Sequence, residues 1–346
     1  MSSQKTVFVS GATGFIALHI VNDLLNAGYR VIGSARSQEK CGKLLEKFGN
    51  NPSLSMEVVK DISDLNAFDE VFKKHAKDIT IVLHTASPFR FDTTEYEKDL
   101  IIPAVNGTKS IFNAIKKYGA QTVERVVVTS SGAAQIQPAY CNRDGLIVDE
   151  STWNDCAWAN CTTDAVTAYC ASKTFAERVA WDFLRENKGQ VKFKLSTVMP
   201  VNVFGPQMFP EPSKTTLNTS SEIINKLVHT NKDTEWDQFN GGYIDVRDVS
   251  RAHLCAFEKE ECAGERLSLF GGMFATQDIL DIINDDFPQL KGKIPVGRPG
   301  TGKELTTKGF QINNERTKIL LGFEFIGLRQ SVDDSVRQIL EVESKA

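Results

Sequence analysis

The chain has 346 residues, of which 41% are hydrophobic and 24% are charged, and its formal net charge is −4. This composition is ordinary for a soluble globular protein that buries a sizeable core. A net charge this small and negative indicates no positively charged surface for nucleic acid or for an anionic membrane. We therefore expect a small-molecule partner.

The sequence shows no disulfide framework and no targeting segment. Its seven cysteines are scattered and form no C-x-x-C pair, which predicts reduced thiols and no metal site. Only five residues precede the first strand-like run, and no apolar stretch is long enough to span a bilayer. We expect a cytoplasmic protein, a monomer or homodimer, without a membrane partner.

Strand and helix patterns alternate through the first 200 residues. Helical stretches such as 14–27, which Gly28 would end, separate short β-branched runs. This alternation predicts an α/β protein with a Rossmann-type, doubly wound parallel sheet. The predicted strands are 6–10, 29–34, 55–59, 79–84, 124–130 and 191–200.

A glycine-rich turn follows the first predicted strand and opens the first helix. Its pattern, G-x-x-G-x-x-A, suits a tight bend, a close approach of phosphate to the backbone, and close packing of the helix on the strand. Backbone N–H groups and the helix dipole would bind the pyrophosphate of a dinucleotide there. The predicted phosphate-binding residues are Gly11, Ala12, Thr13, Gly14, Phe15 and Ile16.

The second strand indicates which dinucleotide is bound. NAD-binding proteins of this kind carry an acidic residue there for the ribose 2′-hydroxyl. This strand has no acid before Glu39; Arg36 stands there instead, with Lys40 one turn further on. Because a guanidinium suits a 2′-phosphate in charge and geometry, we expect NADPH. Two solvated surface cations are the competing interpretation.

The third and fourth strands end in further candidate cofactor contacts. Asp61 would accept a hydrogen bond from the adenine amino group, and Ile62 would cover the ring; a helix N-cap is the competing role of Asp61. Thr85 and Ser87 follow the fourth strand, where a cofactor would cross the edge of the sheet.

Candidate catalytic residues follow the fifth strand. Ser131 lies at its carboxyl end, and Tyr169 and Lys173 are four residues apart, so they share one face of a helix. Carbonyl reduction by hydride transfer needs a proton for the alkoxide, which Tyr169 would donate. We expect the Lys173 ammonium and the oxidised nicotinamide to lower the pKa of that phenol, and Ser131 to donate a hydrogen bond to the substrate oxygen.

After residue 200 the pattern changes to loops, isolated helices and a few strands. Apolar runs at 243–246 and 266–270 could return to the main sheet. We therefore expect a dinucleotide-binding domain over 1–206, completed by 241–270. A smaller C-terminal substrate lobe would comprise 207–240 and 271–346, with helices near 219–229, 277–286, 314–320 and 328–341. A ligand cleft would lie between the two.

Three of these motifs together, GATGFIA, TSS and YCASK, resemble the extended or atypical branch of the short-chain dehydrogenase/reductase superfamily. HTASPF (84–89), DLIIPAVNGT (99–108), VFGPQMF (203–209) and YIDVRDV (243–249) extend the resemblance over nearly the whole chain. Within that branch the chain is similar to yeast NADPH-dependent methylglyoxal reductases, also described as 3-methylbutanal reductases, which are relatives of plant dihydroflavonol reductases.

The resemblance implies an NADPH-dependent oxidoreductase that reduces aldehydes and ketones to alcohols. Ser131, Tyr169 and Lys173 match its catalytic triad, and Lys173 would also hold the nicotinamide ribose. Beyond 11–16, Arg36, Lys40, Asp61 and Ile62, the resemblance adds cofactor contacts at Val203, Phe204, Gly205, Pro206 and Ser220.

Two departures from the yeast reductases concern the substrate pocket. Gly132 and Asn202 stand where those reductases usually carry aromatic residues, which predicts a wider and more polar pocket. Ile136 and Val166 are further candidates for its wall.

Two other functions remain open. A sugar-nucleotide epimerase or a hydroxysteroid-type dehydrogenase would use the same triad, but epimerases typically retain NAD, and Arg36 argues against that cofactor. A regulator that only senses NADP would tend to lose the tyrosine or the lysine, and both are present.

Overall fold

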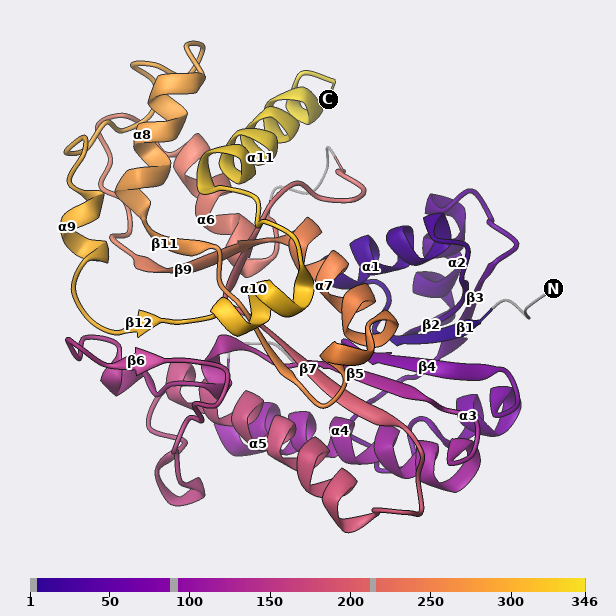
Figure 1. Ribbon diagram of the computed structural model, residues 1–346. Coiled ribbons are helices and arrows are strands. Elements are labelled where there is room, and N and C mark those ends of the chain that lie inside the picture. The colour runs from indigo at the N-terminus through magenta and orange to yellow at the C-terminus, as the bar shows by residue number, and fades with distance from the viewer. Residues whose placement is uncertain (1–4, 88–92, 212–215, 346) are drawn as a thin grey trace.

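A parallel sheet forms the centre of the molecule (Figure 1). The computed structural model describes residues 5–87, 93–211 and 216–345. Within them seven strands pair in the order β10-β7-β5-β4-β1-β2-β3, and every pairing is parallel. Strands covered on both faces need continuous apolar runs, as in TVFVS. The strands are β1 (Thr6–Ser10), β2 (Arg30–Ala35), β3 (Leu54–Val58), β4 (Ile79–His84), β5 (Arg125–Thr129), β7 (Lys194–Pro200) and β10 (Arg266–Leu269).

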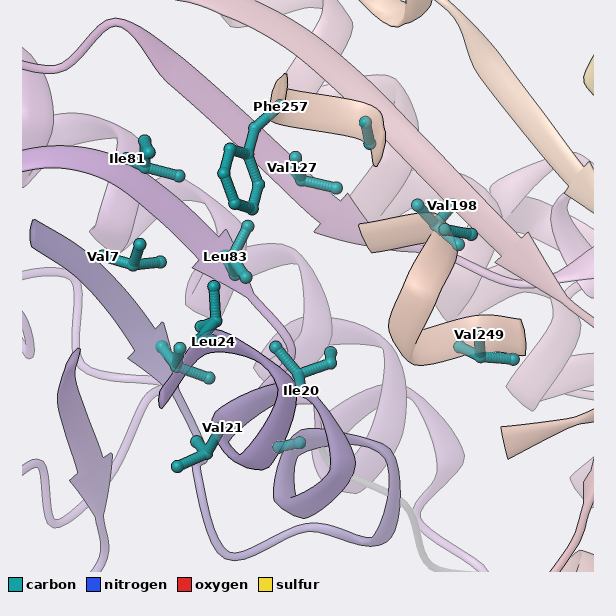
Figure 2. Packing of buried hydrophobic residues seen from close by; sticks show 14 of the residues in the cluster. Val7, Ile20, Val21, Leu24, Ile81, Leu83, Val127, Val198, Val249 and Phe257 are labelled. Carbon is teal, nitrogen blue, oxygen red and sulfur yellow. The ribbon is translucent and has the colours of Figure 1, made fainter. Parts of the chain in front are cut away.

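Helices cover both faces of this sheet. On one face, Leu24 and Phe257 of the helices pack with Val127 and other strand residues (Figure 2). On the other, Phe72 and Phe112 pack with strand residues in a second core. The first face carries α1 (Phe15–Asn26), α2 (Gln38–Lys47) and α7 (Val246–Glu258); the second carries α3 (Asp69–His75), α4 (Ile102–Ala114), extended by η1 (Glu97–Ile101) and η2 (Ile115–Gly119), and α5 (Ala165–Glu186).

Later segments build a smaller lobe beyond the carboxyl edge of the sheet (Figure 1). Its core contains Phe204, Phe274, Ile279 and Val332. A short parallel pair, β6 (Ile147–Val148) and β12 (Gln311–Ile312), lies beside it. The lobe contains β8 (Asn202–Phe204), β9 (Asn240–Asp245), β11 (Gly272–Ala275), α6 (Thr219–His229), α8 (Thr276–Asp286), α9 (Gly302–Thr306) and α11 (Leu328–Glu343).

The predicted fold class is confirmed, with one strand misassigned. The run at 266–270 joins the main sheet as β10, as expected. The run at 243–246 does not: β9 pairs with β8 and β11 in a separate three-stranded sheet. Glycines allow that pairing, because a Cβ on Gly242 would lie 2.8 Å from the ring of Phe270.

One helix of segment 271–346 lies with the main sheet instead of the smaller lobe. α10 (Glu315–Leu321) packs against β10 and α7. The Ser268 N–H of β10 donates to Thr317 Oγ1 of α10 at 2.9 Å. The division of the chain into two lobes therefore stays a prediction. Among the described helices, none is both long and apolar enough to cross a membrane.

The strand order also determines where a ligand can bind. Strands β1 and β4 are neighbours. From β1 the chain continues to β2 and β3 toward one edge of the sheet, and from β4 it continues to β5, β7 and β10 toward the other edge. In such sheets ligands bind in the crevice beyond the carboxyl ends of the strands at this point. The glycine turn, Thr85 and Ser131 follow the carboxyl ends of β1, β4 and β5.

Candidate active site

The turn between β1 and α1 has the geometry that its glycines predict. Gly11 has φ +65°, and a Cβ on it would lie 3.0 Å from Ala86, in the chain after β4. α1 begins at Phe15, and no described side chain caps its first N–H groups. These donors suit an anion at the positive end of the helix dipole. The turn therefore fits a pyrophosphate.

The basic residues expected to bind a 2′-phosphate lie beyond β2. Arg36 and Lys40 are both exposed, and the Lys40 N–H donates to Ser37 Oγ in the N-terminal cap of α2. Asp61 accepts hydrogen bonds from the N–H and Oγ of Ser63, at 2.8 and 2.7 Å. Those bonds hold the pKa of Asp61 below its usual range, and the positive charge of Arg36 acts in the same direction. Asp61 thus stabilises its own turn and is not a helix N-cap.

Other predicted cofactor contacts lie further along the sheet edge. A Cβ on Gly107 of α4 would meet Ile62 Cδ1 at 3.2 Å, so Ile62 packs close to that helix. The Thr85 N–H donates to Ser10 Oγ at 3.1 Å, and its hydroxyl donates to the Ser10 carbonyl. Ser87 lines a small cavity beside Lys173. Pro88 and Phe89 of the HTASPF motif lie outside the described residues.

In the VFGP segment (203–206) the backbone is more accessible to a cofactor than the side chains of Val203 and Phe204, which are buried. Phe204 is fully buried and packs against Phe274 with a centroid distance of 4.8 Å, and Val203 is 6% exposed. Gly205 has φ +116°, and the Pro206 carbonyl lies 3.1 Å from His19 Nε2 of α1. A cofactor would therefore contact this segment through its backbone. Ser220, on α6, lines the cleft.

Ser131 and Tyr169 meet at the end of β5. The Asp164 side chain caps α5 by accepting from the N–H groups of Val166 and Thr167, which sets where the helix begins. Tyr169, in the next turn, shares a hydrogen bond with Ser131. The Ser131 hydroxyl also accepts from the Ala133 N–H at 3.2 Å.

Burial controls the ionisation of Tyr169 and Lys173 in the protein without cofactor. Burial raises the pKa of Tyr169 to about 12, and the Ser131 hydrogen bond only partly opposes this. Burial lowers the pKa of Lys173 to about 8. Desolvation of the phenolate is the largest cause of the shift in the Tyr169 pKa, and Lys173 does not contribute to it. The expected lowering of the Tyr169 pKa involves the oxidised nicotinamide as well as the ammonium, and it stays a prediction.

Lys173 lies behind Tyr169, next to His84. Burial, with a further contribution from the Lys173 charge, lowers the pKa of His84 to about 3, so this imidazole is neutral. Its Nδ1 lies 2.9 Å from Ser10 Oγ. His84 is accordingly a packed residue and not a base, as its place at a strand end suggests.

A cleft of about 1950 Å³ lies at the carboxyl edge of the main sheet, beside segments that follow β7. It brings Ser131 and Tyr169 together with all four residues expected in the substrate pocket, and with Thr13 of the glycine turn. Trp236 and Phe239, which follow β7 in the chain, add aromatic side chains to the wall of the cleft. Arg36, Lys40, Asp61, Ile62, Thr85 and Lys173 are not part of this wall. The four pocket residues are Gly132, Ile136, Val166 and Asn202.

Sequence analysis missed a buried ion pair behind the triad. Glu177, on α5, lies 2.7 Å from Arg266 of β10, and the Glu177 side chain is fully buried. The signal was present: Glu177 follows Tyr169 and Lys173 at the same spacing of four residues. The sequence did not reveal its partner, because Arg266 lies 89 positions after Glu177 in the chain.

Comparisons with known proteins agree with this arrangement. The NAD dependent epimerase/dehydratase family matches residues 7–268. The NADPH-dependent methylglyoxal reductase of Saccharomyces cerevisiae is 56% identical, over 98% of this chain and 99% of the relative. A second protein of that yeast, named only as an uncharacterised oxidoreductase, is also 56% identical, over the full length of both chains.

A solved structure shares the fold throughout. The crystal structure of the yeast methylglyoxal/isovaleraldehyde reductase in complex with NADPH has a TM-score of 0.95 and 56% identity. It covers 99% of this chain and 100% of the other. The resemblance predicted from the motifs is therefore confirmed. The chain belongs to the NAD dependent epimerase/dehydratase family, in the extended short-chain dehydrogenase/reductase branch that includes the yeast methylglyoxal reductase.

Proposed function

We propose that this protein is an NADPH-dependent carbonyl reductase that reduces aldehydes and ketones to alcohols. The observation that carries the proposal is the hydrogen-bonded pair of Ser131 and Tyr169 on the wall of the cleft, beyond the carboxyl ends of the strands. The yeast relative, which matches over nearly its whole length, is named as an NADPH-dependent reductase.

Residues along the carboxyl edge of the sheet hold the cofactor. The turn at 11–16 binds the pyrophosphate, Arg36 and Lys40 bind the 2′-phosphate, and Asp61 and Ile62 contact the adenine. Thr85, Ser87 and the backbone of 203–206 follow the cofactor across the sheet, with Ser220 at the cleft. Bound NADPH supplies the hydride. The absence of an acid at the end of β2 supports NADPH over NADH.

Tyr169 is the general acid. With its pKa raised to about 12, the phenol keeps its proton at neutral pH and can donate it to an alkoxide. Ser131 donates a hydrogen bond to the substrate oxygen and stabilises the charge that develops there. Lys173 contacts the nicotinamide ribose, and a positive ring beside the phenol favours the phenolate that remains after proton transfer.

The substrates range from methylglyoxal and 3-methylbutanal to bulkier ketones. Pockets for drug-sized ligands measure roughly 300–1000 Å³. The cleft of about 1950 Å³ exceeds that range, and it would hold part of the cofactor as well as a substrate. Gly132 lines this cleft, and a Cβ on it would lie 2.8 Å from Val201 Cγ1. We further propose that the protein acts in the cytoplasm, as a monomer or homodimer, with substrate bound between the two lobes.

The test is oxidation of NADPH, followed by absorbance, with methylglyoxal, 3-methylbutanal and a series of aryl ketones of increasing size. NADH is the control cofactor, and we expect much slower turnover with it. Equal rates with both cofactors would contradict the role of Arg36. No oxidation with any carbonyl, by a protein that still binds NADPH, would favour a sensing function.

A further inference from the structure

The buried carboxylate of Glu177 lies next to the candidate active site without facing the cleft. It follows Lys173 by four residues, so Tyr169, Lys173 and Glu177 occupy successive turns on one face of α5. Its side chain is fully buried. Together with Lys173 and Ser130 it lines the small cavity behind the triad.

Four groups donate hydrogen bonds to this carboxylate. Ser130 Oγ donates to Oε2 at 2.6 Å. Thr197 Oγ1 donates to Oε1 at 2.9 Å, Arg266 Nε at 2.7 Å and Trp181 Nε1 at 3.2 Å. The carboxylate thus connects α5 to the residue after β5, to the first residue of β10 and to the middle of β7.

Arg266 is held as firmly as its partner. Its Nη1 donates to the carbonyls of Glu150 and Thr152, at 2.8 and 2.7 Å. Its guanidinium carbon lies 3.7 Å from the ring centre of Trp153. A buried ion pair seldom stabilises a fold more than apolar residues of the same volume would. The ion pair is therefore weak evidence for a purely stabilising role.

Ser130 is the link to the reacting groups, because it directly precedes Ser131. Its N–H donates to the Val198 carbonyl at 2.8 Å, and its hydroxyl donates to Glu177. Tyr169 bonds to Ser131 at one end of the helix face, and Glu177 bonds to Ser130 at the other. The end of β5 is therefore attached to α5 at two points, on either side of Lys173.

We propose that Glu177 is a positioning residue, which acts through Ser130 to fix Ser131 relative to Tyr169 and Lys173. This inference rests on the proposed function, because it assumes that those three residues carry the reaction. A displacement of about 1 Å in such a group can lower a rate by about 10²-fold. Loss of the Ser130 hydroxyl should therefore reduce turnover although no group that contacts substrate has been removed.

A matched pair of substitutions tests the proposal. Ser130→Ala and Thr197→Val each remove one buried hydroxyl that donates to Glu177, and only Ser130 adjoins Ser131. We expect similar losses of thermal stability. For Ser130→Ala we expect kcat to fall about 10- to 100-fold, with little change in the KM for NADPH. Thr197→Val should keep kcat within about twofold, because its hydroxyl does not reach the Ser131 turn.

The pH profile separates positioning from general loosening. The Ser131 hydrogen bond holds the pKa of Tyr169 down. If Ser131 moves, that pKa rises, and the alkaline limit of kcat in Ser130→Ala should move to higher pH. In Thr197→Val it should stay where it is in the parent protein.

Two results would overturn the inference: unchanged kcat in Ser130→Ala, or equal losses of kcat in both variants. The proposed function has its own test. If Tyr169→Phe abolishes turnover while Ser130→Ala retains it, only the positioning role fails. If Tyr169→Phe is fully active, the proposed chemistry fails as well.

Discussion

At the scale of single residues, the protonation of Tyr169 is the property on which the proposed reaction depends. Burial raises the pKa of its phenol to about 12, so the group carries a transferable proton throughout the neutral range. The protein by itself therefore prepares an acid. We expect the charge that stabilises the phenolate to come from the oxidised nicotinamide.

Removal of that proton tests the role directly. In Tyr169→Phe we expect turnover to fall by about 10²- to 10⁴-fold, the usual range for loss of a general acid. Binding of NADPH, followed by its fluorescence, should be unchanged, because the ring remains. Full activity in this variant would rule out Tyr169 as the acid.

Gly132 is the residue at which we expect substrate size to be decided. In Gly132→Tyr an aromatic ring would enter the cleft, so activity toward bulky aryl ketones should fall about 10-fold or more relative to methylglyoxal, on the scale of 1–3 kcal/mol for a pocket contact. The measurement is kcat/KM across the ketone series.

Gly132→Ala is the matched control for that substitution. A Cβ at this position would lie 2.8 Å from Val201 Cγ1, so both variants must displace Val201. Only the tyrosine also fills the cleft. An unchanged ketone profile in Gly132→Tyr, or an identical change in both variants, would remove this position from substrate selection.

At the scale of elements, α5 carries a charge that its fold does not favour. Burial lowers the pKa of Lys173 from 10.5 to about 8, so the folded protein binds this proton less tightly than the unfolded chain does. Below pH 8 both states are protonated, and the buried charge costs about 3 kcal/mol. Between pH 8 and 10.5 the folded state loses the proton, and the cost declines.

Lys173→Met should therefore stabilise the protein while it removes activity. We expect the free energy of unfolding in urea to rise by up to about 3 kcal/mol at pH 7 and by about half as much or less at pH 9.5. Lys109→Met, at an exposed position of α4, is the control and should change stability little at either pH. Destabilisation at pH 7 by Lys173→Met would contradict the assignment of a buried, costly ammonium.

At the scale of the whole molecule, the cofactor should stabilise the folded state. NADPH at 100 times its Kd should raise the free energy of unfolding by about 2.7 kcal/mol. In Arg36→Ala we expect the Kd for NADPH to rise about 10- to 100-fold, as for loss of a charge-assisted hydrogen bond, while the Kd for NADH stays the same. Thermal shift measured against cofactor concentration gives both constants.

A neighbouring cation serves as the control for Arg36. Lys43 is also exposed on this side of the sheet, but it pairs with Glu39 at 2.6 Å. Lys43→Ala should leave the Kd for NADPH unchanged. An equal effect of Arg36→Ala on NADPH and NADH would exclude a 2′-phosphate contact.

Local patterns in the sequence predicted the main sheet and the composition of the site. The strand-and-helix alternation, the glycine turn and the spacing of Tyr169 and Lys173 each lie within one or two elements, so short-range geometry determines them. Six of the main-sheet strands follow this pattern, and β10 was foreseen from its apolar run.

Only the tertiary structure decided the features that join distant segments. The partner of β9 depends on the close approach of Gly242 and Phe270, and burial of Phe204 depends on α8 and β11. Glu177 meets Arg266 because β10 lies beside β7. The pKa of Tyr169 likewise depends on everything packed around it. Sequence determined which groups this protein carries, and packing decided which of them touch, because contact energies act between neighbours in space and not along the chain.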